Sequence, residues 1–249
     1  CRKLLPYRCF LVPLSYHGRV ILQVLSYRRL LIIMYNRCIM EPLTIALIIG
    51  LIVSIVLHEV GHAYAANWLG DPTARLEGRL SVNPLVHIDP IMSILVPGLL
   101  IMSGSPILFG AAKPVPYNPY NFRNQKWGEA IVAAAGPAVN ILLALIFAVV
   151  VQVGAGTSLS ETFLFLAAQL VVMNLFLAFF NLVPIPPLDG SKILPRLLPF
   201  SLRMQYEGFR RFMEQNVFLA FGLVIFLFVV VLGDPLYNFV FSIAKILIS

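Results

Sequence analysis

The amino-acid sequence predicts an all-α polytopic membrane protein. Of its 249 residues, 59% are hydrophobic and only 12% are charged, whereas a soluble domain carries about 25% charged residues. Several apolar runs are long enough to cross a bilayer as helices, which requires about 20 residues each. Two of the segments between these runs are rich in basic residues, as cytoplasmic loops of membrane proteins are.

The net formal charge of +7 comes entirely from the first 39 residues. This segment holds seven of the eighteen basic residues, no acidic residue and all three cysteines, while the remaining chain is neutral and free of cysteine. The distribution gives no indication of nucleic-acid binding and excludes a cysteine-ligated metal from residues 40–249. We expect residues 1–39 to be a non-native or disordered extension, or else a basic segment on the membrane surface. Residues 40–249 are expected to form a single membrane-embedded domain.

Three long helices are expected in the first two thirds of that domain. One begins at Pro42, which suits the first position of a helix, and ends at Leu69, before Gly-Asp-Pro. The next two cover residues 128–153 and 161–183, separated by the short loop 154–160. Prolines 184, 186 and 187 end the third helix, because proline lacks the backbone N–H that a helix interior requires.

The C-terminal part is predicted to hold one more clear span. A polar and basic segment, residues 191–216, precedes the apolar run 217–232. Gly233-Asp234-Pro235 is then expected to turn the chain into a short apolar tail, residues 236–249. The sequence does not decide whether this tail crosses the membrane.

Basic residues predict the orientation of the spans. The regions 70–127 and 190–216 each contain five basic residues, whereas loop 154–160 contains none. Because loops rich in Lys and Arg lie in the cytoplasm, we expect both basic regions to be cytoplasmic and loop 154–160 to be outside.

This orientation has a consequence for residues 90–111. The segment is apolar enough to enter the membrane but contains two glycines and two prolines near its middle. A single crossing would put the two basic regions on opposite sides, so we expect a re-entrant hairpin that turns near Ser103–Pro106. Residues 74–82 partly alternate between apolar and polar and are expected to form either a short β-strand or a plain surface hairpin.

Three ionisable side chains interrupt the first span: His58, Glu59 and His62. A charged side chain at the bilayer centre costs roughly 2.5–3.5 kcal/mol on insertion scales, so such residues usually have a function. In the pattern His-Glu-x-x-His on a helix, the two imidazoles share one face and can bind one zinc ion, and the glutamate can act as general base. A polar stripe that faces a pore or a neighbouring helix is the alternative.

A catalytic zinc site requires a third protein ligand. Asp189 is the candidate, in the stretch Asn-Leu-Val-Pro-Ile-Pro-Pro-Leu-Asp-Gly that begins at Asn181. It follows a span that ends on the same side of the membrane as the span of His58 and His62. His87 and Asp89 are further possible ligands, for which a structural turn is the preferred interpretation. The loop 112–122 is expected to cover the site or to anchor the chain at the headgroups.

The two motifs, together with Gly-Pro-Ala-Val-Asn at residues 136–140, resemble the site-2 protease family of intramembrane zinc metalloproteases. The resemblance implies one zinc ion per chain, held by His58, His62 and Asp189, with Glu59 as general base. It also implies that Asn140 and Asn181 hold the substrate backbone or the oxyanion, with interhelical hydrogen bonding as the alternative.

The sequence therefore predicts a multi-pass enzyme of the cell membrane with its active site towards the cytoplasm. The resemblance implies that the reaction is hydrolysis of peptide bonds in or near transmembrane segments of other membrane proteins, as in regulated intramembrane proteolysis. The expected partners are that substrate and the lipid bilayer, while the oligomeric state is not predicted. A membrane metal transporter and an inactive binding scaffold are the alternative functions.

Overall fold

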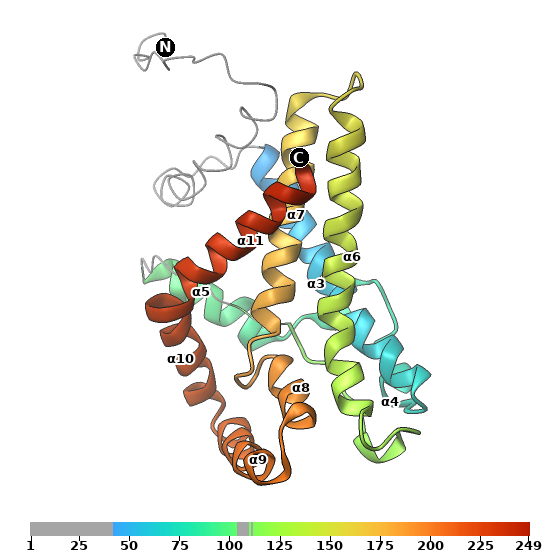
Figure 1. The fold of residues 1–249 in the computed structure, drawn as a ribbon, viewed down its shortest axis with the longest axis vertical. Coiled ribbons are helices and arrows are strands. Elements are labelled where there is room, and N and C mark those ends of the chain that lie inside the picture. The colour runs from blue at the N-terminus through green and yellow to red at the C-terminus, as the bar shows by residue number, and fades with distance from the viewer. Residues whose placement is uncertain (1–41, 104–109, 111) are drawn as a thin grey trace. The chain divides into compact units, whose positions relative to one another are not determined.

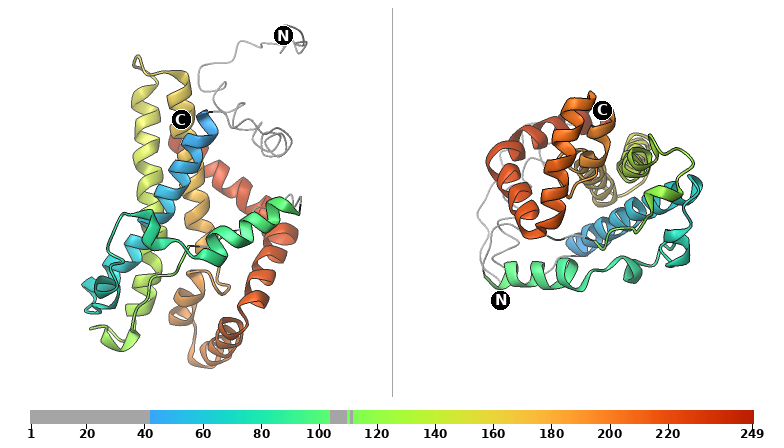
Figure 2. Two further views of the ribbon diagram at one scale, coloured as in Figure 1. Left: turned by 180° about the vertical axis from the view of Figure 1, so that it is seen from behind. Right: turned by 90° about the horizontal axis from the view of Figure 1, so that it is seen from below.

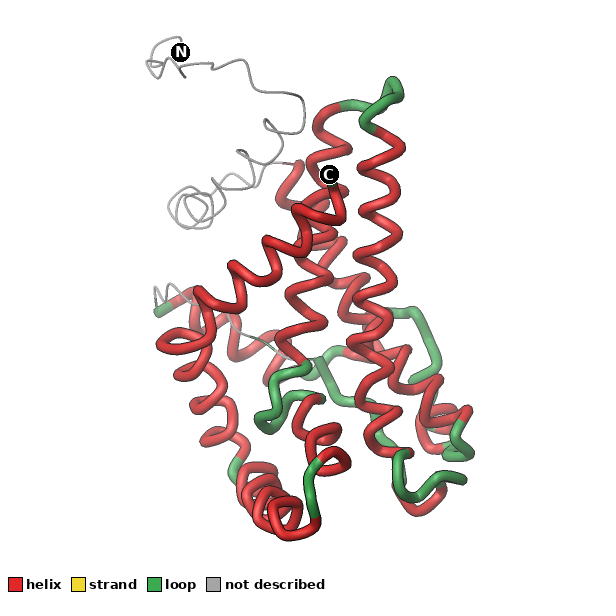
Figure 3. The backbone as a smooth tube through the Cα atoms, viewed as in Figure 1, coloured by secondary structure: helices red, strands yellow, loops and turns green. Residues whose placement is uncertain are grey.

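The structure is a computed structural model that describes residues 42–103, 110 and 112–249. Within them every regular element is helical (Figure 3). The α-helices are α3 (Pro42–Trp68), α4 (Thr73–Leu76), α5 (Val96–Met102), α6 (Gly128–Gly154), α7 (Glu161–Asn181), α8 (Gly190–Leu197), α9 (Phe200–Gln215), α10 (Val217–Leu227) and α11 (Gly233–Ile248). Shorter 3-10 turns cover Pro84–His87 and Pro119–Asn121, and π-helical segments cover Pro90–Leu95 and Phe228–Leu232. The predicted extension, residues 1–39, lies outside the described residues.

Four helical segments are long and apolar enough to cross a membrane: Pro42–Trp68, Gly128–Gly154, Glu161–Asn181 and Val217–Ile248. Many of their large apolar side chains point outwards, such as Ile49 and Val149, each 56% exposed. A lipid environment accepts such surfaces, and helices satisfy their own backbone hydrogen bonds there. The prediction of an all-α polytopic membrane protein is confirmed.

Helices α3, α6 and α7 pack against one another (Figures 1 and 2). Glycines permit this close approach. A Cβ atom on Gly61 would lie 2.8 Å from Val139 Cγ2 and 3.1 Å from the carbonyl oxygen of Ala135, both on α6. A Cβ atom on Gly50 would lie 2.5 Å from Leu170 Cδ2 on α7. In lipid there is no hydrophobic driving force between helices, so their association depends on van der Waals packing. Small residues at the interface strengthen this packing because they let the backbones come close together.

The C-terminal span agrees with the prediction in one respect and differs in another. The chain changes direction between α10 and α11, as Gly233-Asp234-Pro235 predicts (Figure 1). It nevertheless stays helical, because the π-helical segment Phe228–Leu232 leads directly from α10 into α11. Helix α11 packs on α6 and α7 through a buried apolar cluster that includes Ala144, Val171 and Val240. The amide nitrogen of Gln152 donates to the carbonyl oxygen of Leu247 at 2.8 Å, which places the end of α11 near the end of α6.

At the opposite end, Asp71 joins α3 to the loop before α6. Its fully buried carboxylate accepts hydrogen bonds from Thr73 Oγ1 at 2.6 Å, Asn118 N at 2.7 Å and Asn121 Nδ2 at 2.8 Å. Burial would raise the pKa of Asp71, but these hydrogen bonds outweigh it and hold the pKa below its usual range. Gly70 precedes it with φ = 106°, a conformation that other residues rarely adopt.

Glu129, in the first turn of α6, joins α8 and α9 to the same end of the molecule. Its carboxylate accepts hydrogen bonds from Arg196 Nη2 at 3.3 Å and from Arg210 Nη2 at 2.7 Å. The regions 70–127 and 190–216 therefore meet at one end of the helices, and loop 154–160 lies at the other (Figure 1). This is the arrangement that the basic residues predict, although the side of the membrane stays a prediction.

The predicted β-strand at residues 74–82 is wrong. Thr73–Leu76 form the short helix α4 instead, and Gly78 then adopts φ = 69°, which breaks an extended conformation. Leu76 and Val82, two of the alternating apolar side chains, are 77% and 70% exposed. Alternation over so short a segment does not outweigh the turn that its glycine makes.

Residues 90–102 are helical, first as the π-helical segment Pro90–Leu95 and then as α5. The expected turning point lies mostly outside the described residues, which omit 104–109 and 111. The two ends of the segment are close together, because Lys113 N donates to the carbonyl oxygen of His87 at 2.8 Å. This contact is what a re-entrant hairpin requires, while insertion of the hairpin into a membrane stays a prediction.

Candidate metal centre and active site

Helix α3 carries the two histidines and the glutamate of the predicted motif. His58 and His62 are one helical turn apart and share the face that packs against α6, where both side chains are buried. Each ring is fixed by a hydrogen bond at Nδ1: His58 to the side-chain oxygen of Asn140 at 2.5 Å, and His62 to the carbonyl oxygen of Val132 at 2.7 Å. The two rings are nearly perpendicular, with an interplanar angle of 87°, and their Nε2 atoms converge on one point.

The loop after α7 brings Asp189 to these imidazoles. Pro184 to Pro187 prevent α7 from continuing, and the hydroxyl of Tyr206 on α9 donates to the carbonyl oxygen of Pro184 at 2.9 Å. Asp189 is the residue directly before α8 and is buried. Gly190 permits the tight packing of this turn, because a Cβ atom there would lie 2.1 Å from the carbonyl oxygen of Leu182.

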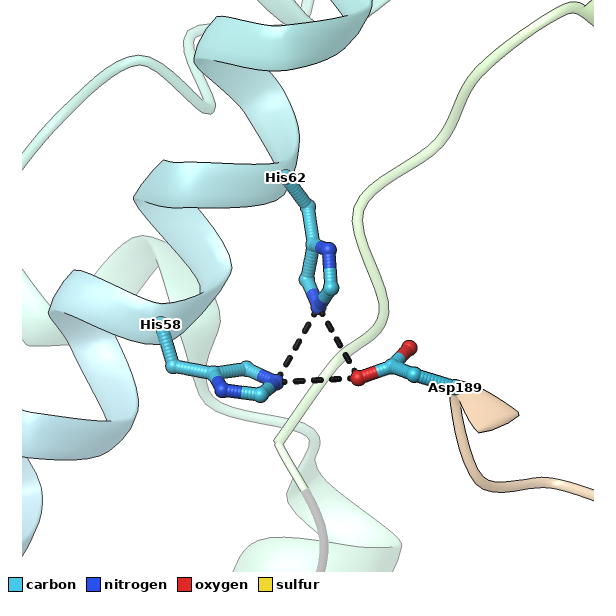
Figure 4. Close-up of side chains that lie close together, drawn as sticks. All are labelled: His58, His62 and Asp189. Carbon is cyan, nitrogen blue, oxygen red and sulfur yellow. Dashed lines mark hydrogen bonds and ion pairs between the residues drawn. The ribbon is translucent and has the colours of Figure 1, made fainter. Parts of the chain in front are cut away.

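Figure 4 shows the resulting triangle of ligand atoms. The two Nε2 atoms of His58 and His62 are 3.0 Å apart, and Asp189 Oδ2 is 3.2 Å from the first and 3.3 Å from the second. If both rings are neutral and donate at Nδ1, all three atoms present lone pairs to one another, an arrangement that a cation between them stabilises. Zinc bonds of about 2.0–2.2 Å at tetrahedral angles would separate the ligand atoms by about 3.3 Å. The three side chains therefore fit a tetrahedral metal ion.

A cavity of about 270 Å³ opens onto this triangle. Glu59 lines it next to the ligands, and no hydrogen bond or ion pair with another described residue engages its carboxylate. The opposite wall comes from the loop before α6, including Pro114, Val115 and Tyr117, and from Phe221 on α10. The predicted cover of the site by loop 112–122 therefore agrees with the lining of the cavity.

Comparison with known proteins agrees with this geometry. A family model described as Peptidase family M50 matches residues 151–229. YwhC of Bacillus subtilis, named "Putative zinc metalloprotease", is 36% identical over 207 residues, which cover 80% of this chain and 88% of that protein. The chain belongs to peptidase family M50, the site-2 protease family.

Two further relatives of the M50 chain are more distant. Rip2 of Mycolicibacterium smegmatis, also named "Putative zinc metalloprotease", is 32% identical over 64% of this chain and 60% of its own length. Zinc metalloprotease MJ0392 of Methanocaldococcus jannaschii is 29% identical over 61% of this chain and 34% of its own length. No solved structure matches the chain.

Gly136 on α6 forms the floor of the candidate metal centre of this M50 chain. A Cβ atom at this position would lie 2.4 Å from His62 Nε2 and 2.7 Å from His58 Nε2. Any side chain would occupy the space into which the two ligand nitrogens point. The glycine of Gly-Pro-Ala-Val-Asn therefore leaves room for the two imidazoles, a role that the sequence pattern alone does not reveal.

The two asparagines predicted to bind substrate occupy different places. Asn140 is fully buried and bonded to His58, and it does not line the cavity. Asn181 lines the cavity, and its amide nitrogen donates to the carbonyl oxygen of Leu177 at 2.9 Å, while no described residue donates a hydrogen bond to its amide oxygen. Substrate binding stays a prediction for both, and the geometry is more compatible with it at Asn181.

His87 and Asp89 lie apart from the ligand cluster. Asp89 caps the segment after it by accepting from Ile91 N at 2.9 Å and Met92 N at 2.8 Å. His87 Nε2 donates to the carbonyl oxygen of Ser81 at 2.8 Å. Both therefore act in a structural turn, as the preferred interpretation holds.

Sequence reasoning missed Lys192, which lines the same cavity. It lies three residues after Asp189 on α8, and its Nζ atom is 5.3 Å from the centre of the Tyr117 ring. Burial acts to lower the pKa of Lys192, but the negative charge around it, including that of Asp189, outweighs burial and raises the pKa. The i, i+3 spacing from Asp189 is the signal that could have identified it.

Proposed function

We propose that this chain is a zinc-dependent intramembrane endopeptidase of the cell membrane that cleaves peptide bonds in or near transmembrane segments of other membrane proteins. The observation that carries the proposal is the triangle of His58, His62 and Asp189 beside Glu59 in a cavity between membrane-spanning helices. The names of the relatives support zinc as the ion.

Each residue then has a defined task. His58, His62 and Asp189 would hold the ion and leave one position open to the cavity. Zinc, when bound, supplies a Lewis acid that polarises a carbonyl oxygen and lowers the pKa of water. Glu59 accepts the proton that the attacking water loses as its oxygen bonds to the peptide carbon. The same carboxylic acid then protonates the amine nitrogen as the carbon–nitrogen bond breaks, which returns Glu59 to its carboxylate form.

The dimensions of the cavity indicate the form of the substrate. A helix with its side chains is about 10–12 Å wide, and a cavity of about 270 Å³ is small even for a ligand pocket, which typically measures roughly 300–1,000 Å³. The substrate segment would therefore enter locally unwound, with a few extended residues at the ligands. Apolar lining residues such as Ile55, Leu177 and Phe180 suit a segment taken from a transmembrane helix.

We further propose that the site faces the cytoplasm, because the ligands lie nearer the end of the molecule that carries the basic regions 70–127 and 190–216. Substrates whose unwound part lies near that face would be the natural class. This would suit regulated intramembrane proteolysis, in which the released fragment leaves towards the cytoplasm.

The decisive experiment compares purified wild-type protein with Glu59→Gln and Asp189→Ala in detergent solution. Zinc per chain and cleavage of a single-span model substrate are measured together. We expect Glu59→Gln to retain zinc and to lose cleavage, because it removes only the proton acceptor. Asp189→Ala should lose both zinc and cleavage, because a ligand is missing. Normal turnover by Glu59→Gln would contradict the mechanism.

A metal transporter is the alternative function, since its pathway would also place histidine and aspartate within the membrane. Proteoliposomes loaded with a fluorescent zinc indicator separate the two functions. Zinc flux that survives Glu59→Gln, without any cleavage by the wild type, would favour the transporter. Zinc binding without flux or cleavage would favour an inactive scaffold.

A further inference from the structure

A chain of hydrogen bonds leads from His58 through two buried asparagines to a third helix. Asn140 on α6 accepts from His58 Nδ1 through Oδ1, and its Nδ2 donates to Oδ1 of Asn174 on α7 at 3.0 Å. The Nδ2 atom of Asn174 donates to the carbonyl oxygen of Leu170 at 2.9 Å. Both asparagines are 0% exposed. The chain therefore connects α3, α6 and α7, and neither asparagine lines the cavity.

The last member of this chain fixes its direction. A backbone carbonyl can only accept a hydrogen bond, so the atom of Asn174 next to Leu170 O is the amide nitrogen. The oxygen of Asn174 then faces Asn140, whose nitrogen must be the atom that donates to it. The oxygen of Asn140 is left for His58, and it can only accept, so His58 carries its proton on Nδ1.

We propose that Asn140 and Asn174 are positioning residues that hold His58 in the tautomer able to bind a metal ion. With the proton on Nδ1, the lone pair of Nε2 faces Asp189 and His62; with the proton on Nε2, that lone pair would be lost. His62 needs no such relay, because the carbonyl oxygen of Val132 fixes its tautomer directly. The difference arises because the neighbour of His58 is an amide, which can rotate by 180° and reverse its polarity unless something else fixes it.

Attachment of one helix to another explains the two buried asparagines less well than orientation of a metal ligand does. Interhelical polar contacts in membranes contribute only about 0.6 kcal/mol on average, and an apolar pair would pack these helices without the cost of burying two amides. Partners that orient a metal ligand, by contrast, typically change metal affinity about 10–100-fold when they are lost. The inference rests on the proposed zinc site, and its test therefore measures metal binding and not proteolysis.

The experiment measures zinc affinity of the full chain in detergent by competition with a chromophoric chelator. Asn174→Leu removes the oxygen that orients Asn140 without touching His58, and Asn140→Leu removes the acceptor itself. We expect zinc affinity to fall about 10-fold in the first and about 100-fold in the second. Asn174→Asp and Asn140→Asp keep the accepting oxygen and should bind zinc within about threefold of the wild type. The Co²⁺-substituted protein should lose absorption intensity in the two leucine variants only.

Asn216→Leu is the matched control, because it removes the same kind of bond, from a side-chain amide to the carbonyl oxygen of Phe212 four residues earlier, on α9. Melting temperatures verify that each variant is folded, and the Asn174 pair decides the question if Asn140→Leu does not fold. Wild-type affinity in Asn174→Leu, or an equal loss in the leucine and aspartate variants, would overturn the relay. Absence of zinc binding by the wild type would instead overturn the proposed function, and the relay with it.

Discussion

Gly136→Ala offers the sharpest test of the metal centre, because it changes one methyl group that touches both histidines. The added Cβ atom would lie 2.4 Å from His62 Nε2 and 2.7 Å from His58 Nε2. Non-bonded heavy atoms keep about 3.5 Å apart, so His62 would have to move by about 1 Å. Metal–ligand distances tolerate only about 0.2 Å, and we therefore expect zinc to be lost.

The expected magnitudes separate metal loss from unfolding. Overpacking a buried site costs about 1–3 kcal/mol, while replacing glycine by alanine within a helix contributes about 1 kcal/mol of stability. The net change in the free energy of unfolding is then about 0–2 kcal/mol, which a folded membrane protein tolerates. Loss of the binding geometry should lower zinc affinity at least about 100-fold, equivalent to about 2.7 kcal/mol.

The assay determines zinc per chain by elemental analysis, together with the melting temperature of the metal-free protein. Gly222→Ala on α10 is the control, because a Cβ atom there meets no other atom within 4 Å. We expect wild-type zinc in Gly222→Ala and no zinc in Gly136→Ala at similar melting temperatures. One zinc per chain with wild-type affinity in Gly136→Ala would refute the assignment of the ligands.

Two further predictions concern the supports of the site. Gly190→Ala should displace Asp189 and abolish zinc binding, because its Cβ atom would lie 2.1 Å from the carbonyl oxygen of Leu182. Elemental analysis measures zinc per chain in this variant and in the control Gly208→Ala, whose Cβ atom meets no atom within 4 Å. Asp71→Asn should lower the free energy of unfolding by roughly 2–3 kcal/mol at neutral pH, because hydrogen bonds to a charged group are lost. Since folding lowers the pKa of Asp71, this stabilisation is complete above about pH 4 and disappears as the pH falls towards the folded-state pKa. Melting temperatures of both proteins should therefore converge in acid, and a constant difference would contradict the assignment.

The spans and the clustering of His58, His62 and Asp189 could be predicted from the sequence, largely from local spacing. Pro42 and Gly70 bound the first span, and the i, i+4 spacing of His58 and His62 puts both on one face of whatever helix forms. Asp189 required one more step, the argument that two basic regions share a side of the membrane. None of these predictions depends on how one helix is rotated relative to another.

The prediction was incomplete at one place and wrong at another. Gly233-Asp234-Pro235 predicts a change of direction, which the chain makes (Figure 1). The sequence did not reveal that the chain stays helical there and that α11 packs on α6 and α7 through an apolar face. At residues 74–82 the alternating pattern was short, and Gly78 with its positive φ ended any extended run. Tertiary contacts decided the first case and backbone conformation the second.

The residues that support the ligands are a different kind of problem. The cost argument that singled out His58 applies equally to Asn174, because a buried amide within a span also needs partners. What that argument cannot supply is the partner, which depends on how α7 is rotated against α6. Gly136 is a similar case, because a glycine in an apolar helix predicts a close contact with another element but does not identify the atoms that make it. That the approaching atoms are the two ligand nitrogens follows from the crossing of α3 and α6. Local sequence motifs are therefore enough to predict which side chains carry the chemistry of the site, whereas the contacts that hold these side chains in position depend on how the helices pack.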